Sequence, residues 1–321
     1  MSRWRNFCIT ELADFCNAQR IPLSAMERAH KKGNFPYYGA SGIVDYIDDY
    51  IFDGSYILIS EDGENLKSRK TPIAFEATGK FWVNNHAHVL KAKKPHLTAL
   101  IIQYFSQLDL SPYLTGAAQP KLNKASLNLI PLYLPIDESE QKAIASVLSS
   151  LDDKIDLLHR QNKTLESMAN TLFRQWFIED AHIHWTEKKL SSFGRIICGK
   201  TPSKKNSLYF GNDVPFLKIP DMHGKVFVFK STDNLSFAGE HSQSKKTIPP
   251  GSICVSCIAT VGLVCITDVS MQTNQQINSI IPNKEYYKYF LYLLMKSMGD
   301  ELNNLASGGT ATLNLNTGDF S

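Results

Sequence analysis

The most regular pattern of apolar residues lies between Pro135 and Phe177, a segment without glycine or internal proline. Apolar side chains recur there at alternating spacings of three and four residues, which predicts a long helix that pairs with another helix along one face. Asp137 followed by Glu140 is a capping pair at its start. The expected length is on the order of 60 Å. The helix-pairing seam consists of Leu148, Leu151, Ile155, Leu158, Asn162, Leu165, Ala169, Leu172 and Trp176.

Asn162 is the one polar member of this seam, and a buried asparagine at such a position commonly sets the register or the number of partners. An amphipathic helix lying on a globular core is the alternative interpretation. The strict spacing and the length favour a coiled coil over that alternative.

The segments on either side of this helix are similar to each other, with short β-rich runs, then a helical run, then a glycine-rich loop. An offset of 193 positions places residues 116–127 on residues 309–320, and residues 96–108 on residues 289–301. Further upstream, residues 51–60 match residues 248–256, and the asparagine-rich residues 83–90 match residues 272–281. Four matches in the same order predict an internal repeat.

The expected fold is therefore α+β, with two similar mixed α/β domains separated by a long coiled-coil-type helix. We place the first domain at residues 1–135, the helix at 136–180 and the second domain at 181–321. The second copy stops in the loop that leads into the long helix in the first copy. A second, distal helix is thus expected after this point and is missing from the sequence.

Composition places the chain among ordinary globular proteins, with 43% hydrophobic and 20% charged residues in 321. The N-terminus has no secretory signal pattern, and no apolar run reaches the roughly 20 residues of a membrane helix. Six cysteines without a disulfide-type spacing indicate reduced thiols and a cytoplasmic protein. The net charge is only +3, but the lysines and arginines are clustered, as phosphate-binding residues are.

Three stretches carry a resemblance to a known family: residues 37–63 (YYGASGIVDYIDDYIFDGSYILISEDG), residues 138–158 with LFRQWF at 172–177, and residues 199–222 (GKTPSKKNSLYFGNDVPFLKIPDM). Together they resemble the specificity subunit of type I restriction–modification enzymes, over nearly the whole chain. The resemblance implies two target-recognition domains, each of which reads one half of a split DNA sequence. It also implies paired helices that set the spacing between the halves.

The same resemblance implies the partners. Modification subunits, two by expectation, would bind S-adenosylmethionine and methylate adenine, and restriction subunits would use ATP and Mg²⁺ to translocate and cleave double-stranded DNA. This chain would then be a non-catalytic reader without a cofactor or metal of its own. The family has a second helix after the second domain, so its absence leaves self-association through the unpaired seam as a further expectation.

Residues with the chemistry for DNA binding occur at matching places in the two copies. Amide and imidazole groups suit base edges in the major groove, and lysine and arginine suit phosphates. The same residue types also occur in turns and on exposed loops that bind no DNA. The residues named next are therefore candidates for DNA binding. They are Lys67, Arg69, Lys70, Asn84, Asn85 and His86 in the first copy, and Lys200, Thr201, Ser203, Lys204, Lys205, Asn274, Gln275 and Gln276 in the second. His88 supplies a further imidazole group in the first copy.

Other signals favour different functions only weakly. Residues 194–201 (GRIICGKT) satisfy the phosphate-loop pattern, but neither a buried strand before it nor a helix after it is expected. Cys254 and Cys257 have metal-type spacing without a second pair, so we expect buried structural thiols. No nucleophile–base pair is evident. The alternative of another class is a coiled-coil interaction scaffold whose globular repeats bind protein and not DNA.

Overall fold

The structure is a computed structural model that describes residues 3–116, 119–182, 184–186, 188–258, 260–299, 301, 302 and 320. The chain forms two compact units, Met1–His159 (unit 1) and Arg160–Ser321 (unit 2). Each unit is described by itself. The fold class is confirmed: both units are mixed α/β and rich in sheet, and a long helix joins them in the sequence.

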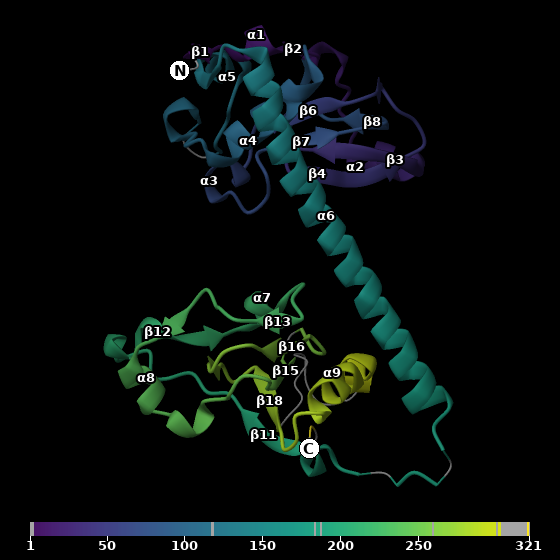
Figure 1. The fold of residues 1–321 in the computed structure, drawn as a ribbon, viewed down its shortest axis with the longest axis vertical. Coiled ribbons are helices and arrows are strands. Elements are labelled where there is room, and N and C mark those ends of the chain that lie inside the picture. Colours follow the sequence, from purple (N-terminus) through teal and green to yellow (C-terminus); the bar gives the residue numbers. More distant parts are fainter. Residues whose placement is uncertain are drawn as a thin grey trace. The chain divides into compact units, whose positions relative to one another are not determined.

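Unit 1 contains two four-stranded sheets (Figure 1). The first is antiparallel, in the order β2 (Ala13–Phe15), β9 (Ala87–Ala92), β6 (Tyr56–Ser60) and β7 (Ala74–Ala77). The second has the order β4 (Gly42–Ile47), β3 (Lys32–Gly39), β8 (Lys80–Val83) and β5 (Phe52–Asp53). Its β3 and β8 are parallel. A separate pair joins β1 (Trp4–Phe7) to β10 (Leu132–Pro135).

The strands and helices of unit 1 bury apolar side chains on both faces of the first sheet. On one face, Phe52 and Phe81 stack at 5.4 Å and pack with Leu58 and Val89. On the other lies α4 (Pro95–Gln107), whose buried residues follow helical spacing from Leu97 to Phe105. The shorter helices are α1 (Ile9–Leu12), α2 (Ala25–His30), α3 (Asn65–Ser68) and α5 (Lys124–Leu129).

Unit 2 repeats this arrangement with different lengths. Its larger sheet has the order β11 (Gly194–Cys198), β18 (Ile277–Pro282), β15 (Ile253–Ser256), β16 (Val264–Thr267) and β13 (Phe227–Val228). Its smaller sheet has the order β14 (Asn234–Leu235), β12 (Phe210–Leu217) and β17 (Gln272–Thr273). The helices are α7 (Ile219–Met222), α8 (Phe237–His241) and α9 (Tyr287–Ser297), and α9 packs on the larger sheet.

The internal repeat is confirmed for three of its four matches. β6 and β15 are the central buried strands, β8 and β17 both pair in parallel with a long strand, and α4 and α9 cover the same face of their sheets. The fourth match places the glycine-rich loop of residues 116–127 on residues 309–320, of which only residue 320 is described.

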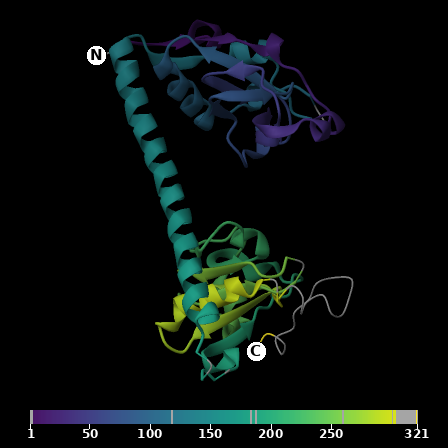
Figure 2. The same ribbon diagram turned by 90° about the vertical axis from the view of Figure 1, so that its right-hand side faces the viewer.

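The long helix α6 runs without interruption from Glu138 to Arg174 and continues into a π-helical turn, Gln175–Glu179 (Figure 2). The carboxylate of Asp137 accepts the backbone N–H of Glu140 at 3.2 Å, as expected of a helix cap. No helix in the described part of the chain is both long and apolar enough to span a bilayer.

Candidate nucleic-acid interface

The loop after β11 is held tightly against the turn between β17 and β18 of unit 2. The N–H of Gly199 donates to the carbonyl of Ile277 at 3.0 Å, and the N–H of Lys200 donates to that of Thr273 at 2.9 Å. A Cβ added at Gly199 would lie 2.1 Å from the carbonyl oxygen of Asn274, a distance that real Cβ atoms do not adopt. Only glycine fits there, so the residue joins two loops that lie far apart in the sequence.

Asn274 shapes the turn itself. Its N–H donates to Leu217 at 3.1 Å, its side-chain Oδ1 accepts the N–H of Gln276 at 3.1 Å, and its Nδ2 donates to the Gln276 Oε1 at 2.9 Å. Asn274 is buried, whereas Gln275 at the tip of the turn is exposed. An asparagine that bonds the backbone two residues on is a standard turn former.

Thr201 and Gln275, 74 positions apart, meet at this tip. The Thr201 hydroxyl donates to Gln275 Oε1 at 2.6 Å. With its oxygen held, the amide of Gln275 has a fixed direction for its Nε2 donors. Lys200, Lys204 and Lys205 are exposed on the same loop, which ends at a turn closed by the Ser203 carbonyl and the N–H of Asn206. The structure thus places the Gln275 amide beside a loop that carries three exposed lysines, and the role of these candidates in DNA binding stays a prediction.

Two buried glutamines beneath the loop were missed in the sequence. Gln243 Nε2 donates to the carbonyl of Lys200 and to Gln272 Oε1, both at 2.7 Å. Gln272 Nε2 in turn donates to the carbonyl of Glu240 at 3.0 Å and to the Thr247 hydroxyl at 2.9 Å. Neither stands out in the sequence, because Gln243 lies in the polar run 240–246 and Gln272 begins the polar run 272–276. Polar composition by itself does not identify a hydrogen-bond partner.

Unit 1 has the same turn between β8 and β9. The N–H of Asn84 donates to the carbonyl of Tyr38 at 3.0 Å, and its Oδ1 accepts the N–H of His86 at 2.8 Å. Asn85 is exposed at the tip, in the place of Gln275. His86 Nδ1 lies 2.9 Å from both carboxylate oxygens of Asp62, so Asp62 orients the ring and leaves Nε2 outward. Asp62 was not among the sequence candidates.

His88 belongs to β9 itself, two residues after His86, and its side chain is buried. Asn17 Nδ2 lies 2.9 Å from its Nδ1, and its Nε2 lies 2.7 Å from the carbonyl oxygen of Leu122, so the bonds fit a neutral ring protonated on Nε2. Burial lowers the pKa of His88 below its ordinary value, and the contacts with Leu122 and Glu61 oppose this only in part. His88 therefore has a structural position, and it cannot reach a base edge without leaving the core.

A partly buried ion pair supports the same turn. Arg20 Nη1 lies 2.7 Å from Glu61 Oε2 and donates to the carbonyl of Ala87 at 2.7 Å. Burial alone would raise the pKa of Glu61, but the Arg20 hydrogen bond and the nearby charges outweigh it, and the net shift is downward. A carboxylate held ionised keeps Arg20 in place across the turn.

The three basic candidates around α3 lie in different surroundings. Lys67 and Lys70 are exposed. Arg69 has a left-handed backbone (φ 49°), and its guanidinium donates to the carbonyls of Phe105 (2.6 Å), Ser106 (3.1 Å) and Leu108 (2.5 Å). It thereby satisfies carbonyls at the C-terminal end of α4. The sequence offered no sign of this role.

The phosphate-loop geometry does not form at residues 194–201. β11 occupies residues 194–198 and pairs with β18, so its backbone N–H groups lie in a sheet. The part of the chain that follows, up to the 3-10 turn at Ser207–Tyr209, contains no helix. Cys254, Cys257 and Cys265 are free thiols buried in the sheet, and in the described residues no three His, Cys, Asp or Glu side chains are grouped as metal ligands.

The seam on α6 is largely exposed. Leu148 packs against the core of unit 1, and Ala169 is half-buried. Asn162 and the remaining seam residues are exposed, the apolar ones by 40–61%. The long helix is therefore observed, whereas pairing along the seam stays a prediction.

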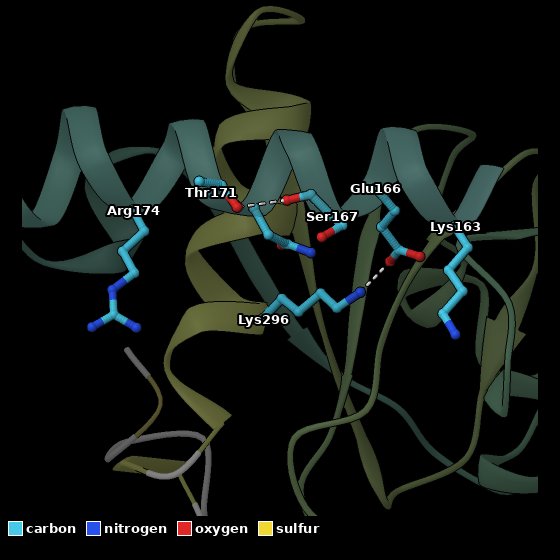
Figure 3. Close-up of a pocket in the computed structure, with 7 residues that line it drawn as sticks. Lys163, Glu166, Ser167, Thr171, Arg174 and Lys296 are labelled. Carbon is cyan, nitrogen blue, oxygen red and sulfur yellow. Dashed lines mark hydrogen bonds and ion pairs between the residues drawn. The ribbon is translucent and has the colours of Figure 1, made fainter. Parts of the chain in front are cut away.

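The last turns of α6 pack on α9 of unit 2 by another face. Phe173 is buried against Phe290, with ring centroids 5.6 Å apart. Figure 3 shows Lys296 of α9 reaching the carboxylate of Glu166, and Tyr292 donates to the same carboxylate at 3.0 Å. The groove along this contact, of about 410 Å³, is lined by polar side chains of Lys163, Glu166, Ser167, Asn170, Thr171, Arg174 and Lys296.

Comparison with known proteins agrees with this architecture. The family model of the type I restriction modification DNA specificity domain matches residues 1–167 and 182–321, one match for each half of the chain. The HindI specificity subunit of a type I restriction enzyme from Haemophilus influenzae is 41% identical over 276 residues, which is 63% of this chain and 60% of that protein. The chain therefore covers less than two thirds of that relative's length.

Two further matches extend over more of the chain. A putative type I restriction enzyme specificity subunit of H. influenzae, S.HindORF215P, is 29% identical over 94% of this chain and 78% of its own length. The crystal structure of the S subunit of a type I restriction–modification system from M. genitalium has a TM-score of 0.58 over 99% of this chain and 83% of that chain, at 14% identity, and so supports the fold. The chain belongs to the family of type I restriction–modification DNA specificity subunits.

Proposed function

We propose that the chain is the DNA-reading subunit of a type I restriction–modification complex and that each unit reads one half of a bipartite target. The observation that carries this proposal is the repeated turn. In both units an asparagine fixes the backbone, and a neighbouring group orients an amide or imidazole close to the exposed tip: Thr201 for Gln275 and Asp62 for His86. Side chains held in this way suit direct readout of base edges.

The exposed lysines would contact phosphates and set the register on the duplex. Lys200, Lys204 and Lys205 lie on the loop beside Gln275, and Lys67 and Lys70 lie at α3 in unit 1. Partner subunits would perform the chemistry: two modification subunits with S-adenosylmethionine for adenine methylation, and restriction subunits with ATP and Mg²⁺ for cleavage. The setting of such a complex is the cytoplasm.

Salt dependence of DNA binding tests the lysine assignment. Affinity for a random-sequence duplex, measured by fluorescence anisotropy from 50 to 200 mM salt, should fall steeply, because bound phosphates release counterions. The triple variant Lys200→Gln/Lys204→Gln/Lys205→Gln should reduce the log–log slope by about 2–3.

Lys188→Gln/Lys189→Gln is the matched control, because these exposed lysines precede β11, at the end opposite Gly199. It should leave the slope nearly unchanged. DNA binding that is insensitive to salt, or the absence of DNA binding at low salt, would argue for the scaffold alternative, in which the units bind protein.

A further inference from the structure

The hairpin of β3 and β4 is fixed beside the turn between β8 and β9 of unit 1. Only Ala40 and Ser41 separate its two strands. The hydroxyl of Ser60, at the end of β6, donates to the carbonyl of Ala40 at 2.5 Å. The N–H of Asn84 donates to the carbonyl of Tyr38, near the end of β3, at 3.0 Å. These two bonds hold the tip of the hairpin in place relative to the turn.

Val44 is an extra residue in the pairing of this hairpin. Tyr38 pairs with Ile43, whereas the preceding Tyr37 pairs with Asp45, so Val44 has no partner on β3. A β-bulge of this kind bends its strand and changes the direction in which a side chain points.

The bulged residue lies next to the turn. A Cβ added at Gly39 would lie 2.6 Å from Cγ2 of Val44 and 3.4 Å from Nδ2 of Asn84, so the valine methyl group and the amide are neighbours around one point. Val44 is 58% exposed, and the exposed residues Asn85 and His86 follow Asn84 directly. A single exposed valine is ordinary. This one is distinguished by the bulge and by its place beside an exposed amide and imidazole.

An apolar group beside an amide and an imidazole suits one base in particular. In the major groove only thymine presents a methyl group, at C5, and apolar side chains contact it. We propose that Val44 is a specificity-determining residue that contacts the C5 methyl group of a thymine in the half-site of unit 1, while Asn85 and His86 bond polar base edges. This inference rests on the proposed function, because it requires that unit 1 reads DNA through this turn.

Unit 2 has different chemistry at the equivalent place. β12 ends at Leu217, whose carbonyl accepts the N–H of Asn274 as that of Tyr38 does for Asn84 in unit 1. No tight hairpin follows, because residues 218–233 separate β12 from β14. Nζ of Lys218 donates to the carboxylate of Asp233 at 2.6 Å. An ion pair therefore takes the place of the exposed valine, and we expect the dependence on a thymine methyl group in the half-site of unit 1.

Replacement of thymine by uracil tests the proposal, because uracil lacks only the C5 methyl group. The full chain, assembled with the proposed modification subunit, is titrated by fluorescence anisotropy with duplexes that carry the mapped methylation motif. Uracil replaces, one at a time, each thymine on either strand of the half-site that substitutions at Asn85 and His86 relax. At one position we expect wild type to bind about three- to tenfold more weakly, as the loss of a buried methyl contact implies.

The variant Val44→Ala completes the test. It should bind the unmodified duplex more weakly by a similar factor, and uracil at the same position should change its affinity by less than about twofold, because the methyl contact is already lost. Val147→Ala is the matched control, since Val147 is a similarly exposed valine (61%) on α6. This control should keep the full wild-type response to uracil.

Three results would overturn the role of Val44 and leave the proposed function intact. They are a half-site without any A·T pair, no effect of uracil at any position in wild type, and an equal effect of uracil in wild type and Val44→Ala. If Val44→Ala instead prevents assembly with the modification subunit, the hairpin is a protein contact and the proposal is wrong. A complex that neither binds nor methylates DNA would contradict the proposed function itself, and with it the role of Val44.

Discussion

Asn84 and Asn274 occupy equivalent turns, and both bond the backbone two residues on. The sequence showed them as polar, asparagine-rich runs at matching places, so the position of both turns could be predicted. The partners that orient the side chains near the tips, Asp62 and Thr201, come from distant loops, and no local pattern joins such residues. Arg69 is a second example of a role that the sequence does not reveal. An arginine side chain is suited to bind phosphate, but this guanidinium donates to carbonyl groups at the end of α4.

His88 makes the stability of unit 1 depend on pH. Its pKa is lowered in the folded state, so the neutral ring contributes stability that is present above about pH 6.5 and is lost as the pH falls through the lower folded pKa. Denaturant unfolding of unit 1 should therefore show a midpoint that decreases from pH 7 to pH 5.

In His88→Gln this decrease should be smaller, although the variant is less stable at pH 7 because it loses buried hydrogen bonds. His30→Gln serves as the control, because that side chain is exposed at the end of α2, and should keep the wild-type decrease. An equal pH dependence in wild type and His88→Gln would contradict the assignment.

At the scale of elements, the central helix was the most predictable part of the chain. Its spacing, its capping pair and its lack of glycine agree with α6 at Glu138–Arg174. Spacing alone did not show that α6 uses a different face, which includes Phe173, to pack on unit 2, because that face has only a few apolar residues. Helix faces that bind one neighbour over a short length leave little periodic signal.

Phe173 should carry much of the contact between α6 and unit 2. Its ring is buried at 4% exposure and lies 5.1 Å from Phe177 and 5.6 Å from Phe290. Phe173→Ala should lower the free energy of unfolding of unit 2 by about 3–5 kcal/mol, measured by guanidinium denaturation.

Thr171→Ala, at an exposed position two residues away, should change it by less than about 1 kcal/mol. If both variants unfold at the same denaturant concentration, the aromatic contact does not stabilise the docking of the helix.

For the whole molecule, duplication is the organising feature. Two units share a sheet order, a parallel strand pair and a covering helix, while their side chains at the turn tips differ: Asn85 and His86 in one, Gln275 and Gln276 in the other. A common scaffold with different tips suits two half-targets of different sequence. The recognised bases could not be predicted, because they depend on which donor reaches which groove edge.

The most direct measurement is a map of methylated adenines in a host without other methylation, after co-expression of the chain with the proposed modification subunit. We predict a bipartite motif in which Gln275→Ala relaxes only one half, and Asn85→Ala/His86→Ala relaxes only the other. No methylated motif despite confirmed assembly, or variants that change both halves together, would contradict the claim that each unit reads its own half-site.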